Sequence, residues 1–256
     1  MTQPVYPLYD QHAHLWPLIA PLESYRDEMR EWVDVVRDVL GERAALEVLD
    51  LGTGGGHHLF HFADLWQGDV SGVATDLSTA MLERVGGLIE SFECLQADMT
   101  ELALGRKFSL VSVHDSFCYL RQADQVARLF ATISAHLETD GMALVKVDAL
   151  AGEFEGPYRY LTTFEEPDRE VTLTHYEWDP DPSDSELEVF YHFLERRGQT
   201  LSSREERHVM GLFSRLDLES LSGRAGLSSR WVELERWDED RPNPLLVLRP
   251  LSLANP

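Results

Sequence analysis

The chain has 256 residues, of which 43% are hydrophobic and 26% charged, as in an ordinary globular protein. Its formal net charge of −23 disfavours nucleic acid as a partner, because nucleic-acid binders need a basic surface. The longest apolar runs, such as 108–113 and 142–147, are much shorter than the roughly 18 residues of a membrane span. With no leader pattern in the first four residues, Met1-Thr2-Gln3-Pro4, we expect a cytoplasmic protein without a membrane segment.

From residue 23 to residue 147, helical and strand patterns alternate. Apolar residues at steps of three and four predict a helix over 23–40, and Gly41 stands where that helix would end. Alternation of strand and helix indicates a parallel sheet covered on both faces. The expected strands are 46–51, 70–75, 93–96, 108–113 and 142–147, and the expected helices between them are 58–66, 79–89 and 122–137.

The pattern changes after Asp148. Residues 170–177 and 188–194 alternate in polarity like half-exposed strands and are separated by a turn-rich segment. A helix is expected over 216–225, and 231–237 with 245–248 should close the chain as a hairpin. The prediction is a doubly wound α/β core, residues 1–148 and 211–256, with a mostly parallel seven-stranded sheet, and an antiparallel β insertion, residues 149–210, that covers the substrate.

The first predicted strand leads into a glycine-rich turn, Asp50-Leu51-Gly52-Thr53-Gly54-Gly55-Gly56-His57. Glycine is needed where the backbone turns sharply or approaches a ligand, and the helix that follows offers free N–H groups. A dinucleotide fingerprint would place its third glycine at position 57, which is His57. The glycines instead fall at 52, 54 and 56.

Acidic residues also follow the next two strands. Asp76 ends the second strand, where a carboxylate in a nucleotide-binding α/β fold accepts hydrogen bonds from ribose hydroxyls. Asp98 and Met99 follow the third strand. A solvated aspartate or a core methionine is the ordinary alternative for each position alone, but the three features in order are more specific.

Taken together, these segments resemble class I S-adenosylmethionine-dependent methyltransferases, and within them small-molecule N-methyltransferases such as the dimethyltransferases of nucleotide-linked amino sugars. Tyr9-Asp10 and the insertion fit that group, whereas His114-Asp115 departs from it. The resemblance implies that Asp98 reaches the adenine amino group with Met99 against the ring, and that Tyr9 and Tyr25 close over the methionine part. The expected cofactor site comprises Tyr9, Tyr25, Asp50, Gly52, Thr53, Gly54, Gly56, Asp76, Leu77, Met81, Asp98, Met99 and His114.

Methyl transfer from a sulfonium needs alignment of the nucleophile, and an amine nucleophile must lose its proton. His114 and Asp115 end the fourth strand, where ligands bind in open α/β sheets, so they are the predicted catalytic residues, with a structural histidine as the alternative for His114. Tyr119 and His208 are predicted to face the substrate, with a core position as the alternative for Tyr119 and a strand edge as the alternative for His208.

The predicted function is therefore methyl transfer from S-adenosylmethionine to a small molecule, most readily an amine. The alternatives are a nicotinamide-dependent oxidoreductase on a similar fold and a protein that binds S-adenosylmethionine without turnover. A protein acceptor stays open, and so does a homodimer. Cys94 and Cys118 should be free thiols, and no histidine–carboxylate spacing indicates a metal site.

Overall fold

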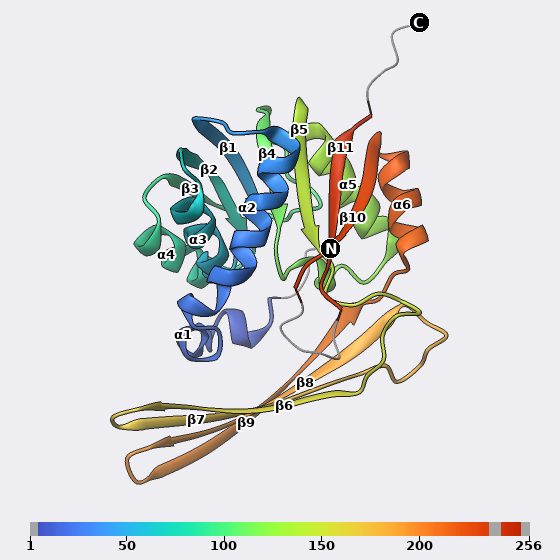
Figure 1. Cartoon of the computed structure of the whole chain (residues 1–256). Coiled ribbons are helices and arrows are strands. Elements are labelled where there is room, and N and C mark those ends of the chain that lie inside the picture. Colours follow the sequence, from blue (N-terminus) through green and yellow to red (C-terminus); the bar gives the residue numbers. More distant parts are fainter. Residues whose placement is uncertain (1–4, 236–241, 252–256) are drawn as a thin grey trace, which may run out of the picture.

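The computed structural model describes residues 5–235 and 242–251, which form a large sheet between layers of helices and a smaller sheet that projects from it (Figure 1). In the large sheet the strand order is β10-β11-β5-β4-β1-β2-β3. Neighbours from β3 to β5 run parallel, and β11 runs antiparallel to both β5 and β10. The prediction of a doubly wound, mostly parallel seven-stranded sheet is confirmed. Its strands are β1 Ala45–Leu51, β2 Asp69–Asp76, β3 Phe92–Gln96, β4 Phe108–Val113, β5 Leu137–Lys146, β10 Leu227–Glu233 and β11 Pro244–Pro250.

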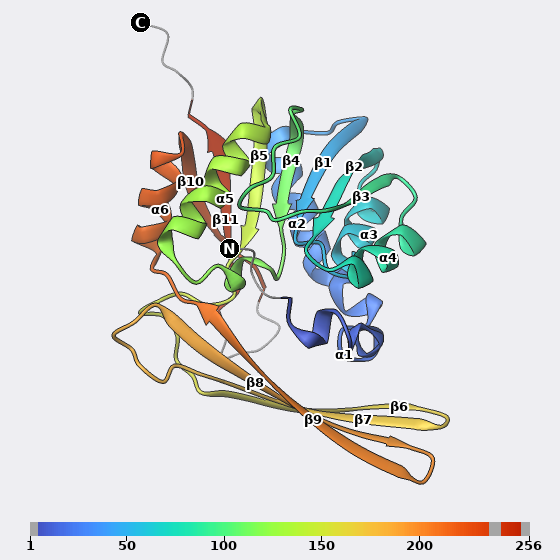
Figure 2. The same ribbon diagram turned by 180° about the vertical axis from the view of Figure 1, so that it is seen from behind.

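Helices cover both faces of this sheet (Figures 1 and 2). Successive residues of a strand point to opposite faces, so Leu46 and Val48 of β1 join one apolar cluster and Leu49 and Leu51 join the other. The first cluster packs against α2 Arg26–Leu40, α3 His57–Leu65 and α4 Thr79–Leu88, and the second packs against α5 Ala123–His136 and α6 Arg215–Arg224. Among the described residues, no helix has both the length and the apolar character that crossing a bilayer would require.

The segment before α2 folds into short turns of helix. They are η1 Pro7–Tyr9, η2 Ala13–Leu15, α1 Trp16–Ile19 and η3 Leu22–Tyr25. Leu8 and Leu15 pack with Val171 and Phe193 of the small sheet. This segment therefore lies between the small sheet and the core, near the carboxyl ends of the parallel strands.

The small sheet is antiparallel, in the order β6-β7-β8-β9, and extends well beyond the core (Figure 2). Its strands are β6 Tyr158–Glu166, β7 Arg169–Trp178, β8 Glu186–Arg197 and β9 Thr200–Gly211. The sequence pattern predicted only parts of β7 and β8. It missed β6 because most of its residues are exposed, and it missed β9 because the buried positions of that strand include the polar residues Glu206 and His208, so no apolar period marks either strand.

Other boundaries differ by a few residues. The predicted helix 122–137 ends at His136, since β5 begins at Leu137 rather than at 142. The closing hairpin is present as β10 and β11, which pair from Leu227 with Pro250 to Glu233 with Pro244. Trp237, which the hairpin prediction included, and the first four residues, on which the leader prediction depended, lie outside the described residues.

Gly72 provides a test of the sheet packing. A Cβ atom on Gly72 would collide with the Val48 carbonyl oxygen of the neighbouring strand, whereas a Cβ atom on Gly86 of α4 would meet open space. We expect Gly72→Ala to lower the free energy of unfolding by about 1–3 kcal/mol or more. Gly86→Ala should instead raise it by about 0.5–1 kcal/mol, because alanine is the better helix former. Urea denaturation measures both, and equal effects would contradict this account.

Candidate active site

The turn between β1 and α3 is built on left-handed glycines. Gly52, Gly54 and Gly56 have φ angles of 71°, 54° and 74°, which side chains with a Cβ atom rarely adopt. The turn is tied to β2, because Thr53 N–H donates to the Thr75 carbonyl oxygen and Gly54 N–H donates to Asp76 Oδ2, both at 2.8 Å. The start of α3 is thereby presented to a cavity at the edge of the sheet.

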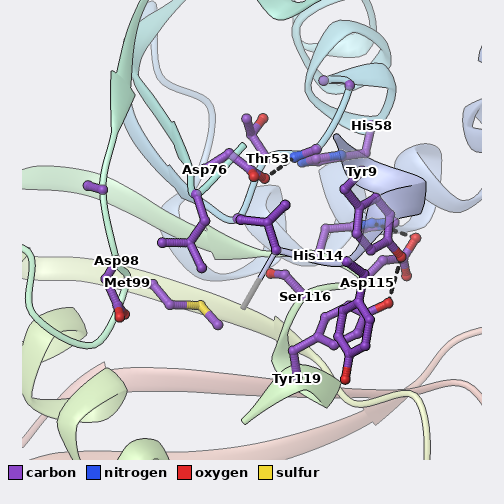
Figure 3. Close-up of a pocket in the computed structure, with 18 of the residues that line it drawn as sticks. Tyr9, Thr53, His58, Asp76, Asp98, Met99, His114, Asp115, Ser116 and Tyr119 are labelled. Atoms are coloured by element: carbon purple, nitrogen blue, oxygen red, sulfur yellow. Dashed lines mark hydrogen bonds and ion pairs between the residues drawn. The ribbon is translucent and has the colours of Figure 1, made fainter. Parts of the chain in front are cut away.

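This cavity has a volume of about 770 Å³. It lies at the carboxyl ends of β1, β2, β3 and β4, where open α/β sheets bind their ligands (Figure 3). Thirteen of the predicted site residues line it, and the sequence reasoning missed others, including Tyr6, Trp16 and Ser116. The thirteen are Tyr9, Tyr25, Gly52, Thr53, Gly54, Gly56, Asp76, Leu77, Asp98, Met99, His114, Asp115 and Tyr119.

The carboxylates of Asp76 and Asp98 stand at successive strand ends on the cavity wall (Figure 3). Asp76 Oδ1 accepts the Ser78 N–H at 2.8 Å, and burial raises the pKa of Asp76 although these backbone N–H groups lower it. Asp98 Oδ1 accepts the N–H and the hydroxyl of Thr100, each at 2.8 Å. Both carboxylates are thus held in fixed orientations that suit hydroxyl and amino donors on a ligand.

Three predicted contact residues lie behind the wall instead. Asp50 is fully buried and binds within the protein, with His58 Nε2 at 2.9 Å and the Ser112 hydroxyl donating to Oδ1. Burial raises the pKa of Asp50, but His58 and these hydrogen bonds lower it further. Met81 is a fully buried core residue of α4, and His208 is fully buried behind Tyr119. Asp50 and Met81, predicted to bind the cofactor, and His208, predicted to face the substrate, therefore do not line the cavity.

His114 belongs to a network of buried charges. Its Nδ1 lies 3.1 Å from Asp115 Oδ2 and its Nε2 lies 3.3 Å from Glu28 Oε2. Lys146 Nζ completes the network, 2.8 Å from Glu28 Oε1 and 2.9 Å from Asp115 Oδ1. Burial lowers the pKa of His114, yet Asp115 and Glu28 outweigh it and raise that pKa to about 9. Both ring nitrogens therefore face carboxylates, and neither is placed to accept a proton from a substrate.

Asp115 is the cavity-facing member of this network. Among residues 5–235 and 242–251, it is the one residue other than glycine with a left-handed φ, 51°. Such strain persists where the surrounding structure fixes it, often at functional sites. Burial raises the pKa of Asp115, but His114 and Lys146 hold it well below its usual range. The cavity therefore contains a permanently ionised carboxylate.

Aromatic side chains close the cavity on the side of the N-terminal segment. The Tyr9 and Tyr119 hydroxyls lie 2.6 Å apart (Figure 3). Trp16 packs on Tyr9 with ring centroids at 5.6 Å. The indole nitrogen of Trp16 is buried without a protein partner and adjoins Gly55 of the glycine turn. Trp16 lies on a four-residue helix, which leaves no periodic signal in the sequence.

These features suit S-adenosylmethionine. Two carboxylates on the cavity wall can accept hydrogen bonds, Met99 offers an apolar surface, and the Trp16 indole N–H is a buried donor without a protein acceptor. The described residues contain no group of three or more histidines, cysteines and carboxylates that could hold a metal ion.

Known proteins agree with this geometry. Residues 48–141 match the methyltransferase domain family. Over 138 residues the chain is 33% identical to the dTDP-3-amino-3,4,6-trideoxy-alpha-D-glucopyranose N,N-dimethyltransferase of Streptomyces venezuelae. That alignment covers 53% of this chain and 56% of the relative, so it spans about half of each protein.

Solved structures match over nearly the whole chain. DesVI of Streptomyces venezuelae has a TM-score of 0.79 and 25% identity, over 93% of this chain and 98% of DesVI. CalS10, an amino pentose methyltransferase of Micromonospora echinaspora with bound S-adenosylmethionine, has a TM-score of 0.76 and 20% identity, over 97% and 99%. The chain therefore carries a methyltransferase domain and the Rossmann-like methyltransferase fold. The predicted resemblance to amino-sugar N-methyltransferases is confirmed, and a nicotinamide oxidoreductase is not favoured.

The charge network predicts a pH-dependent stability. The pKa of His114 is raised from 6.5 to about 9, so its contribution is complete below pH 6.5 and is lost as the pH rises through 9. The destabilisation caused by His114→Gln should therefore shrink between pH 6.5 and pH 9.5, by on the order of 2–3 kcal/mol. Urea denaturation of both proteins across this range measures it. A difference that stays constant with pH would exclude a charged His114.

Proposed function

We propose that the protein transfers methyl groups from S-adenosylmethionine to the amino nitrogen of a nucleotide-linked amino sugar. One observation carries the proposal: the glycine turn and the carboxylates of Asp76 and Asp98 face a single cavity, in the methyltransferase fold. The activity named for the 33% identical relative supports a sugar amine as the acceptor. Bound S-adenosylmethionine would supply a methyl group already activated by its sulfonium charge.

The adenosyl half of the cofactor site follows from the strand ends. Asp76 would accept hydrogen bonds from the ribose hydroxyls, and Asp98 would accept one from the adenine amino group beside Met99. Trp16 and Tyr25 lie across the turn from them and would enclose the methionine part. Asp50 and Met81 support this half from behind, because they hold the first strand end and α4 in place.

The acceptor half is bounded by Tyr9, Tyr119 and Asp115. A cavity of about 770 Å³ lies in the upper part of the range of about 300–1,000 Å³ for ligand sites, which leaves space for a second molecule beside the cofactor. The ionised Asp115 would attract an ammonium group, and the aromatic wall would exclude water and orient the amine. His114 keeps Asp115 in position, so we assign it a positioning role in place of general base.

A nucleotide-linked acceptor also needs cationic groups at the entrance. Arg121 and Arg128 line the cavity, with their guanidinium groups about half exposed and paired to Glu186 and Asp124 respectively. They favour an anionic substituent at this end of the cavity despite the net charge of −23.

Three further features are proposals: the role of the insertion, the location of the protein and its oligomeric state. We propose that the insertion 149–210 covers the acceptor, that the protein acts in the cytoplasm, and that it forms a homodimer. Size-exclusion chromatography with light scattering tests the last of these, and a mass of one chain in solution would exclude it.

The first prediction concerns the cofactor. Wild-type protein should bind S-adenosylhomocysteine and not NADH in a calorimetric titration. Asp76→Ala should weaken that binding about 10–100-fold, since hydrogen bonds to a charged group contribute about 1.5–3 kcal/mol. Asp69→Ala, at the exposed opposite end of the same strand, is the matched control and should bind like wild type. Equal loss in both variants, or NADH binding, would refute this assignment.

The second prediction concerns the acceptor. Nucleotide-linked amino sugars should gain one or two methyl groups in mass spectrometry, with release of S-adenosylhomocysteine. The same sugar with a hydroxyl in place of the amine should not react, because the ionised Asp115 attracts an ammonium group and a neutral hydroxyl offers it no charge. Cofactor binding without turnover of any amine would support the non-catalytic alternative.

A further inference from the structure

A chain of hydrogen bonds leads from the cavity wall into the small sheet. The Tyr9 hydroxyl lies 2.6 Å from the Tyr119 hydroxyl, which lies 3.0 Å from His208 Nδ1. On the other side of the ring, His208 Nε2 lies 3.3 Å from Glu206 Oε2. Tyr9 and Tyr119 line the cavity, whereas His208 is fully buried and Glu206 is 8% exposed. These hydrogen bonds thus connect the acceptor region of the cavity to the buried pair of His208 and Glu206.

The direction of each bond follows from the chemistry of its members. A carboxylate oxygen accepts, so we assign the proton of His208 to Nε2, where it faces Glu206 Oε2. Nδ1 then accepts from the Tyr119 hydroxyl, which in turn accepts from Tyr9. Burial raises the pKa of Tyr9 and of Tyr119 well above the usual value, so both side chains are neutral hydroxyls able to donate and accept.

The surroundings hold this arrangement in place. The Tyr6 ring stacks on His208 with centroids at 3.9 Å, and the Tyr191 ring meets it edge-on at 4.9 Å. The Leu8 N–H donates to Glu206 Oε2 at 3.0 Å. Among the residues that the structure describes, the titratable groups that face His208 are four tyrosines and one carboxylate from the N-terminal segment, η4 Phe117–Tyr119, β8 and β9: Tyr6, Tyr9, Tyr119, Tyr191 and Glu206.

We propose that Tyr9, Tyr119, His208 and Glu206 form a relay that takes the proton from the acceptor amine. This proposal rests on the proposed function. The ammonium N–H transfers its proton to the Tyr9 oxygen, Tyr9 passes its own proton to Tyr119, and Tyr119 passes its proton to His208 Nδ1. The amine is left neutral with its electron pair free, both tyrosines stay neutral, and His208 becomes an imidazolium beside the Glu206 carboxylate.

The relay answers a requirement of repeated methylation. An alkylamine has a pKa of about 10, as lysine does, so it is mostly protonated near neutral pH and cannot attack a methyl group. Each transfer to a neutral amine also produces an ammonium that has to lose a proton before the next transfer. His208 supplies an internal acceptor for one such proton, and it returns that proton through Tyr119 and Tyr9 before it accepts the next.

The experiment compares His208→Gln and Tyr119→Phe with wild type in methyl transfer to an amino sugar from pH 6.5 to pH 9.5. Near pH 6.5 both variants should have a kcat about 100-fold below wild type and accumulate the monomethylated product. The deficit should shrink steadily as the pH rises, because solution then supplies the neutral amine. Taking the ratio to wild type at each pH cancels titrations, such as that of His114, that all the proteins share.

Controls separate the relay from packing. His192→Gln changes a histidine of β8 that is not a member of the proposed relay, and this variant should match wild type at every pH. Glu206→Gln keeps the shape of the pair but removes the charge that stabilises the imidazolium, so its deficit should have the same pH dependence. S-adenosylhomocysteine affinity should be unchanged in the His208 and Glu206 variants, because neither residue lines the cavity.

The outcomes distinguish failure of the relay from failure of the proposed function. A deficit that falls with pH supports the relay. A deficit that is uniform with pH, or no deficit, in His208→Gln and Tyr119→Phe overturns it while leaving the proposed function standing. Failure of the wild type to methylate any amine while still binding the cofactor overturns the proposed function, and the relay with it.

Discussion

The turn between β1 and α3 is the constraint on which the rest of the site depends. Its backbone passes through left-handed angles at Gly52, Gly54 and Gly56, and the Asp76 carboxylate holds it through the Gly54 N–H. A Cβ atom on Gly52 would collide with Ser116, which follows β4. The turn is thus fitted between the ends of β2 and β4. Because it is held on both sides, the cavity keeps the shape that the cofactor requires.

Buried charge is the second organising feature of the core. Taking Asp50, Glu28 and Lys146 largely out of water is costly unless each ion is paired and hydrogen-bonded, and the partly exposed Asp115 pairs with Lys146 at the cavity. Asp50 joins β1 to α3 and β4 through His58 and Ser112, and Lys146 joins β5 to α2 through Glu28. The His58 and His114 rings stack with centroids at 4.5 Å, so the two sets of charges are in contact. These bonds link elements distant in the sequence at the floor of the cavity, which favours one arrangement of the strand ends.

The small sheet contributes to the site through the N-terminal segment. η1 and η2 pack on β7 and β8 through Leu8 and Leu15, and the end of β9 packs on η4 through Met210 and Cys118. Tyr9 and Tyr119 are consequently brought together from positions 110 residues apart in the chain. The wall formed by Tyr9 and Tyr119 therefore belongs to the contact between the two sheets, whereas Asp76 and Asp98 stand at strand ends of the large sheet.

Local signals were sufficient for the core and for the cofactor side. Apolar strands, a glycine turn and an acidic residue at each strand end are all short-range patterns, and parallel strands bring their carboxyl ends to one edge without further information. The sequence alone therefore predicted the doubly wound fold, Asp76, Asp98 and the glycine turn. It could not distinguish a wall residue from one behind the wall, as with Asp50, Met81 and His208, because that depends on which face of an element meets the cavity.

Only the tertiary structure decided the state of His114 and the partners of Tyr119. The adjacent Asp115 raises the pKa of His114 most, but Lys146 and Glu28, which lie 32 and 86 positions away in the chain, also act on it, and no local pattern encodes their contacts. Strands β6 and β9 were likewise invisible, since β6 is mostly exposed and the buried positions of β9 include the polar residues Glu206 and His208, which leave no apolar period. Short-range regularity thus determined the fold and the cofactor-binding edge, whereas long-range packing determined the protonation and the acceptor side.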